Sequence, residues 1–266
     1  MVNKINIVDG RIETTIFDND IDCEFIPKND KFLVDSLKIK IKQDTELELS
    51  IKNKKDSKID IFVNVLEGVN LNVYEYINSS NIKIQYKYYL EKNSNVEIKK
   101  INNVNSIKEY DIVNLNGENS KFKRVLKTIS NGLEKYDMLI YHNEKNSRSD
   151  MINHGVNILE GNLVFNVSTF VPKDVSGCYA NQTNRIINLT DNKCQISPNM
   201  YIDCFDVVAN HSAFIGAFSE NELFYLQSRG IPYQEATKLL IKGFLTSELN
   251  EEQKRIYNKI LNKYWR

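Results

Sequence analysis

Residues 58–66, KIDIFVNVL, place isoleucine or valine at every second position, with mostly polar residues between them. Alternation over so short a run is typical of a β-strand that buries one face. The same pattern returns in LNVYEYI (71–77), IKIQYKYYL (82–90), VEIKKI (96–101) and LVFNVSTFV (163–171). The sequence therefore predicts a mainly β protein up to about residue 218.

Short polar turns separate these runs roughly every 12–16 residues, with no helical pattern between them. Such spacing suits a β-sandwich, a barrel or a β-solenoid. The pairs Asn116-Gly117 and Asn131-Gly132 favour hairpins, and hence the sandwich. Residues 1–57 also contain strand-like runs: INIVDGRIETTIF (5–17), LKIKIKQ (37–43) and ELELSIK (46–52). The strand pattern alone does not choose among the three architectures.

Composition limits the class of protein. The 266 residues are 41% hydrophobic, and 35 basic residues balance 35 acidic ones. This suits a sizeable core and does not indicate a nucleic-acid surface. We find no 18-residue apolar run and no signal peptide, so we expect a cytoplasmic protein without a membrane span. The four cysteines form no CxxC pair and are expected to be free thiols.

The last fifty residues change to a helical period. Ser219 and Glu222 have the spacing of a capping box, and Gly230 suits the end of the helix that they start. A second helix is expected from Pro232, with this apolar stripe: Ala236, Leu239, Leu240 and Phe244. A last helix from about Asn250 gathers the following side chains: Ile256, Tyr257, Ile260, Leu261, Tyr264 and Trp265. We expect these helices to form a small bundle.

Motifs of enzymes are missing from the chain. There is no GxSxG nucleophile elbow and no GxxxxGK[ST] phosphate-binding loop, since glycine is nowhere followed by lysine. We therefore expect a protein that is not an enzyme and that binds no nucleotide by itself.

Several short motifs follow one another between residues 141 and 248: NSRS (146–149), QTNR (182–185), HSA (211–213) and LFYLQSRGI (223–231). Together, in this order and spacing, they resemble the SufB/SufD family, the scaffold subunits of SUF iron–sulfur cluster assembly. The run from Phe224 to Ile231 is closer to SufD than to SufB.

The resemblance implies a right-handed β-helix, so it selects the solenoid over the sandwich. Residues 1–218 would form this core, of which 1–57 are irregular N-terminal strands, and 219–266 would form a helical region that docks the ATPase. The long N-terminal helical region of the family would be shortened. The implied partners are a SufC-type ATPase and either a SufB-type scaffold or a second copy of the chain. A transient iron–sulfur cluster would form on the complex, and a cysteine desulfurase or sulfur carrier would act indirectly.

The resemblance also implies site residues. His211 takes the position of a SufD histidine, and Cys194 lies close to a cysteine of SufB; both are tentative ligands of a nascent cluster. The competing interpretations are a histidine at a strand–helix junction bonded to a carbonyl, and a cysteine that is merely a small buried hydrophobe. Cys178 and Cys204 are weaker candidates, and a structural role is expected for His142 and His154.

The implied partner-binding residues lie in the first C-terminal helix and just after it: Phe224, Tyr225, Arg229 and Gly230. Aromatic and arginine side chains are the usual anchors of protein interfaces. The alternative function is a β-solenoid that acts on or binds carbohydrate. Such sites expose clustered carboxylates and aromatics, whereas the acidic residues here are scattered among lysines.

Overall fold

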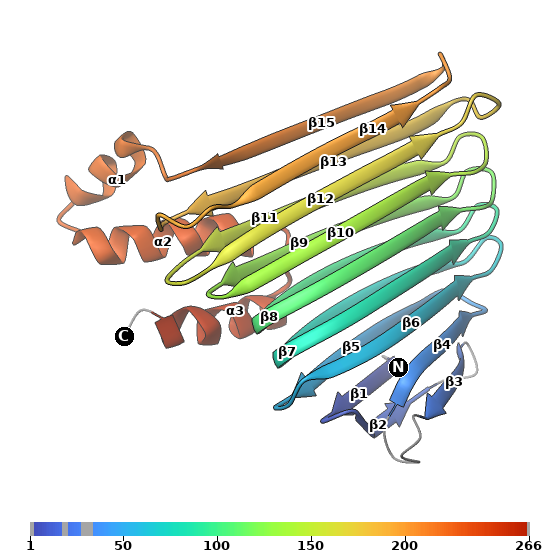
Figure 1. Ribbon diagram of the computed structural model, residues 1–266, viewed down its shortest axis with the longest axis horizontal. Helices are drawn as coiled ribbons and strands as arrows, with labels where there is room; N and C mark the ends of the chain where they lie inside the picture. Colours follow the sequence, from blue (N-terminus) through green and yellow to red (C-terminus); the bar gives the residue numbers. More distant parts are fainter. Residues whose placement is uncertain (1–2, 18–20, 28–33, 265–266) are drawn as a thin grey trace.

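The computed structural model describes residues 3–17, 21–27 and 34–264. The chain winds into a β-solenoid, in which stacked coils are followed by three helices (Figure 1). The predictions of a mainly β fold and of a β-helix are therefore confirmed. Trp265, expected on the last helix, lies outside the described residues.

Two walls of parallel strands enclose the core. One wall contains β1 (Asn3–Val8), β5 (Thr45–Asn53), β9 (Lys121–Ser130), β11 (Arg148–Asn157), β13 (Cys178–Asn188) and β15 (Val207–Gly216). The other contains β4 (Val34–Ile41), β6 (Ser57–Val65), β10 (Leu133–His142), β12 (Asn162–Val171) and β14 (Gln195–Ile202). The strands β7 (Asn70–Leu90) and β8 (Asn95–Leu115) are each 21 residues long and continue through both walls. At the N-terminal end, β2 (Arg11–Ile16) and β3 (Ile21–Pro27) pair antiparallel with β1 and β4.

The alternation that predicted strands decides which side chains face the interior. In β6, for example, the buried residues are Ile59, Ile61, Val63 and Val65, and the residues between them face outward. One apolar cluster fills most of the solenoid from β1 to β13. Burying a side chain of this size stabilises the fold by about 1.5–3 kcal/mol.

One corner of the coil repeats with a left-handed residue. This corner residue is Gly68, Asn93, Asn119, Asn146 and Gly177 in successive coils, with φ between 56° and 74°. Its N–H donates to a carbonyl of the next coil, as from Asn93 to Glu118 (2.9 Å) and from Asn119 to Lys145 (3.1 Å). Glycine and asparagine tolerate this backbone conformation better than other residues do. The corner therefore ties each coil to its neighbour.

The Asn-Gly pairs do not form hairpins, contrary to the hint of a sandwich. Gly117 and Gly132 lie at corners where the neighbouring coil comes very close. A Cβ added to Gly117 would lie 1.9 Å from the backbone nitrogen of Lys92, and one on Gly132 would lie 2.0 Å from the carbonyl oxygen of Asn105. Glycine is needed here because the coils stack backbone against backbone.

Three helices follow the solenoid: α1 (Glu220–Gln227), α2 (Tyr233–Thr246) and α3 (Glu251–Tyr264). The capping box is present, since the amide of Glu222 donates to Ser219 Oγ (3.2 Å) and the amide of Ser219 donates to Glu222 Oε2 (2.9 Å). Pro232 is the residue before α2 rather than its first residue. None of the described helices is long and apolar enough to cross a bilayer.

The helices do not form a bundle of their own. Residues of α2 and α3 share one apolar cluster with outward-facing residues of β8, β9, β11 and β13: Ile101, Ile129, Val156 and Ile187. This rotates the buried stripe of α2, whose buried apolar residues are Ala236, Ile241 and Leu245, whereas Leu239 is 47% exposed. The predicted stripe was therefore wrong at Leu239. We call the wall with this apolar cluster the helix-covered wall and the wall of β4 to β14 the open wall.

Candidate functional site

The last coil of the solenoid has two strands with free edges. We call residues 194–216, which include β14 and β15, the terminal coil; it forms the upper edge of Figure 1. Among the described strands, β14 pairs only with β12, and β15 pairs only with β13. Each therefore presents unpaired N–H and C=O groups, which are a template for pairing with another chain.

Apolar side chains accompany these free edges. Five large hydrophobic residues of the terminal coil are exposed by 42% or more: Tyr201, Phe205, Val208, Phe214 and Ile215. Natural edge strands are usually protected from pairing by charged side chains or by being very short. An exposed edge with apolar residues is typical of an interaction surface.

His211 lies in the middle of β15, at the open end of the interior. Its register partner is Gln182, whose amide nitrogen donates to Thr169 Oγ1 (2.9 Å) and to the Asn199 carbonyl (3.1 Å) across the coil. Because paired residues of a parallel ladder point to the same face, His211 also points inward. With no further coil above it, the side chain is exposed.

The strand–helix junction interpretation of His211 is wrong. The strand continues to Gly216, and α1 begins at Glu220. Among the described residues, the imidazole forms no hydrogen bond or ion pair. Its ring nitrogens are thus free to bind a ligand.

Cys194 also belongs to the terminal coil but lies on the other wall. It is half-buried just before β14, and it packs against the main apolar cluster. Burial raises the pKa of its thiol, so less of it is the nucleophilic thiolate at neutral pH. Asn199 is level with His211 across the coil, and Cys194 precedes Asn199 by five residues, or about 16 Å of extended strand. The two candidate ligands do not meet within one chain.

The other histidines have structural roles, as expected. His142 is fully buried between the hydroxyls of Ser147 (2.8 Å) and Ser149 (2.9 Å), and burial lowers its pKa to about 4. The ring of His154 stacks on Phe244 of α2 at 4.7 Å, and its Nδ1 lies 2.7 Å from Lys127 Nζ. Within residues 3–17, 21–27 and 34–264, no three His, Cys, Asp or Glu side chains gather as a metal site.

Cys178 and Cys204 pack together at a corner, where Cys204 belongs to the terminal coil and Cys178 to the coil before it. Cys178 is buried in a small apolar cluster with Val171 and Val175, against which Cys204 and Val207 pack. Its sulfur lies 3.4 Å from Ser147 Oγ. Burial raises the pKa of the Cys178 thiol. This environment is that of a packing residue.

A buried charged cluster inside the solenoid was not predicted. Lys100 Nζ lies 3.2 Å from Glu75 Oε1 and 2.7 Å from Glu109 Oε2, and Arg124 Nη2 lies 2.5 Å from Glu109 Oε1. Arg124 also pairs with Asp111. Burial raises the pKa of Glu75. The signal was visible in the sequence, because these residues occupy inward positions of otherwise apolar alternating strands.

The first helix, α1, buries none of its residues. Phe224 and Tyr225 are 72% and 59% exposed, and the Arg229 guanidinium lies 5.4 Å from the centre of the Tyr225 ring. Gly230 has φ +83° and directs the chain into α2. The four predicted partner-binding residues therefore lie together on an uncovered surface, which we call the α1 surface.

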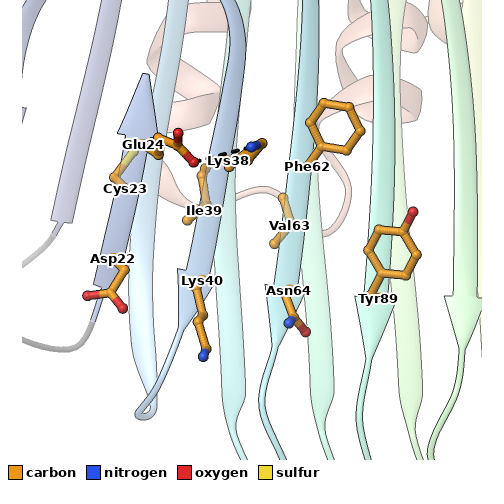
Figure 2. A pocket seen from close by; sticks show the side chains of 10 residues that line it. All are labelled: Asp22, Cys23, Glu24, Lys38, Ile39, Lys40, Phe62, Val63, Asn64 and Tyr89. Atoms are coloured by element: carbon orange, nitrogen blue, oxygen red, sulfur yellow. Dashed lines mark hydrogen bonds and ion pairs between the residues drawn. The ribbon is translucent and has the colours of Figure 1, made fainter. Parts of the chain in front are cut away.

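Fold and site together define an elongated β-solenoid with an open terminal coil and an exposed helix. A depression of about 440 Å³ on the open wall is lined by side chains of both charges, including the ion pair of Lys38 and Glu24 at 3.3 Å (Figure 2).

The family model described as "SUF system FeS cluster assembly, SufBD core domain" matches residues 29–244. The chain therefore belongs to the SufB/SufD family, as its motifs indicated. It is 34% identical to the iron–sulfur cluster assembly protein SufD of Bacillus subtilis over 119 residues, which are 44% of this chain and 27% of that protein. It is 29% identical to SufD of Escherichia coli over 146 residues, 52% of this chain and 34% of that protein. The chain thus matches about a third or less of the length of these relatives.

Proposed function

We propose that the chain is a scaffold subunit of SUF iron–sulfur cluster assembly and that a partner supplies ATP hydrolysis. The proposal rests on family membership, on the names of the relatives and on the lack of a phosphate-binding loop motif. Its cargo would be a transient iron–sulfur cluster, built in the cytoplasm from sulfur that a cysteine desulfurase or sulfur carrier delivers indirectly.

The observation that carries the proposal is the open terminal coil. Its free strand edges and exposed apolar side chains would pair with a second scaffold, either a SufB-like subunit or another copy of this chain. Such pairing would satisfy the edge N–H and C=O groups and bury the apolar residues in one step. The chain itself would then act through the assembly rather than as an enzyme.

Cluster ligands would be completed across that interface. His211 offers an unoccupied imidazole, a borderline ligand for iron, and Cys194 offers a softer thiolate. The two lie on different walls and are about 16 Å apart along the strand direction. A nascent cluster would therefore be bound by one of these residues together with groups of the paired subunit. Binding by so few ligands from this chain would be weak enough for the cluster to be released.

The α1 surface is the proposed dock of a SufC-type ATPase. Phe224, Tyr225 and Arg229 are exposed and form a compact aromatic and cationic patch, the composition of an interface anchor. For ATP binding to act on the scaffold, the patch must bind one nucleotide state of the ATPase more tightly than the other.

The cluster role is tested with His211→Ala, co-expressed anaerobically with the other assembly components. We expect the iron content per scaffold to fall several-fold, while the melting temperature stays nearly unchanged because the exposed imidazole forms no hydrogen bond, ion pair or ring contact in the described fold. Asn210→Ala, an exposed neighbour that points to the opposite face, is the matched control. Full iron loading of the His211 variant would contradict the proposed role, and so would an equal loss in the control.

The docking role is tested with the double variant Tyr225→Ala, Arg229→Ala in a pull-down of the ATPase. We expect loss of co-purification with an unchanged circular dichroism spectrum, since α1 buries none of its residues. The control is Arg255→Ala, Lys259→Ala, two exposed positions of α3. Retention of the ATPase by the α1 variant would place the dock elsewhere.

A further inference from the structure

The outer face of the open wall carries four lysines in register, one per coil. Lys58 pairs with Lys83, Lys83 with Lys108, and Lys108 with Lys135. We call these four residues the lysine row. Neighbouring strands are about 4.8 Å apart, so the row sets four ammonium groups along a line of about 14 Å.

This row is unfavourable to the fold, unlike other stacked rows of the solenoid. The rings of Tyr141 and Phe170 stack at 4.8 Å, and the amide of Asn103 donates to Asn78 Oδ1 at 2.9 Å, so both rows gain from repetition. Like charges directly opposite each other on adjacent strands repel instead. A row that costs stability in every coil is a candidate for function.

The repulsion is compensated only at the two ends of the row. Lys58 Nζ lies 3.8 Å from Asp60, and Lys135 Nζ lies 2.9 Å from Asp137, each two residues further along its own strand. At the equivalent positions after Lys83 and Lys108 stand Gln85 and Tyr110. In the described part of the chain, neither of these two central lysines forms an ion pair.

The face that bears the row has no cover in the described chain. The apolar cluster that holds α2 and α3 belongs to the other wall. Tyr89 and Tyr110 are both 38% exposed on this face, and the depression of Figure 2 continues it with Lys38, Lys40 and Phe62. Because this depression also contains Asp22 and Glu24, the positive charge is concentrated in the lysine row itself, which lies on an uncovered face with aromatic rings beside it.

We propose that the lysine row is a docking strip for an extended acidic segment of a partner protein, a role beyond the scaffold function proposed above. Alternate side chains of an extended peptide lie about 6.6 Å apart on one face, so three carboxylates would span the row. Asp60 and Asp137 already pair with the two end lysines, so the row presents its unpaired charge at Lys83 and Lys108, which suits a short acidic segment better than a long polyanion. The face also lacks the apolar insertion that anchors proteins in a bilayer.

The test is the double variant Lys83→Gln, Lys108→Gln, with fluorescent poly-L-glutamate as the probe at low ionic strength. We expect about tenfold weaker binding, because two surface ion pairs are lost. We also expect the melting temperature to rise by about 1–2 °C, because repulsion within the row is removed. A lysine pair with a purely structural role would lower it. The control is Lys145→Gln, Lys173→Gln, which removes the same charge from two exposed turns.

Three results would overturn the proposal. The first is unchanged binding of poly-L-glutamate to the variant of the central lysines. The second is an equal loss in the turn variant, which would mean that the probe senses only net charge. The third is tighter binding of heparin or of phosphatidylserine vesicles than of poly-L-glutamate, with the same dependence on the row, since the occupant would then be a phosphate- or sulfate-type polyanion or a membrane.

Discussion

The two ends of the solenoid present strand edges of opposite character. At the N-terminal end, the outermost strands β2 and β3 run antiparallel to their neighbours, are six and seven residues long, and carry charges such as Arg11, Glu13 and Glu24. At the C-terminal end, β14 and β15 are eight and ten residues long, run parallel to their neighbours and expose apolar side chains. Short, charged edges prevent strand addition, and long apolar ones invite it. The difference favours the C-terminal end over the N-terminal end as the surface of the pairing proposed above.

The contrast between the two ends would be wrong if both bound a second scaffold equally well. Phe205→Lys, Val208→Lys changes two of the most exposed apolar residues of the terminal coil. We expect association with a second scaffold to weaken about a thousandfold, or roughly 4 kcal/mol, because buried unpaired ammonium groups are costly. Multi-angle light scattering and pull-down measure the effect.

The matched change at the other end is Thr15→Lys, Ile16→Lys on β2. It should leave association unchanged, because that edge is already charged and short. Loss of association in this variant, or none in the terminal-coil variant, would mean that the two ends do not differ as described.

The coils between the two ends contain the buried charged cluster, whose contribution to stability can be measured. Arg124→Met leaves Glu109 and Asp111 without their guanidinium. We expect a loss of about 3 kcal/mol in the free energy of unfolding, the low end for a broken buried pair, because Lys100 still contacts Glu109. The control is Lys123→Met, one residue earlier and facing outward. It should change the free energy of unfolding by no more than about 0.5 kcal/mol. Equal effects in urea titrations would show that the interior charge carries no stability.

A smaller effect concerns pH. Burial raises the pKa of Glu134 from 4.5 to about 7, against hydrogen bonds from Thr128 and Tyr136 that lower it. The folded state therefore binds the proton of the Glu134 carboxyl more tightly than the unfolded state does. The protonated carboxyl stabilises the fold fully below pH 4.5, and this stabilisation is lost as the pH rises through 7. Between pH 5 and pH 8 we expect the free energy of unfolding of the wild type to fall by roughly 2–3 kcal/mol relative to Glu134→Gln, which keeps an acceptor oxygen. If the free energies of unfolding of the two proteins changed with pH in parallel, the Glu134 carboxyl would not be protonated in the folded state.

Much of the fold could be predicted from strand alternation, because a buried face every second residue leaves a clear pattern in β6 or β12. The solenoid could not be distinguished from a sandwich by periodicity. Stacked residues are 25 apart at Asn78 and Asn103 but 31 apart at Asn153 and Asn184, so no fixed repeat length appears. The corner glycines and asparagines do repeat, yet asparagine is so common in this chain that they do not stand out.

The site was predicted less completely. The α1 surface followed from local signals, the capping box and exposed aromatics, which need no tertiary information. The orientation of α2 could not be predicted from local signals. Which of its residues are buried depends on Val156 and Ile187 of the helix-covered wall rather than on the pattern within the helix. The wide separation of Cys194 and His211 depends on how β14 and β15 face each other, which only the three-dimensional coil determines.

The corner residue has a consequence for how such a chain can change in evolution. Each corner N–H bonds to the next coil in the same way, from Gly68 onward to Gly177. Removal or duplication of one entire coil would leave every remaining corner bond with a partner and every side chain on its own face. Loss of a single strand residue would reverse inside and outside for the rest of that strand. Insertions and deletions among homologues should therefore come in whole coils or fall in the turns, and the length of the solenoid becomes an adjustable spacing between its charged N-terminal edge and its apolar terminal coil.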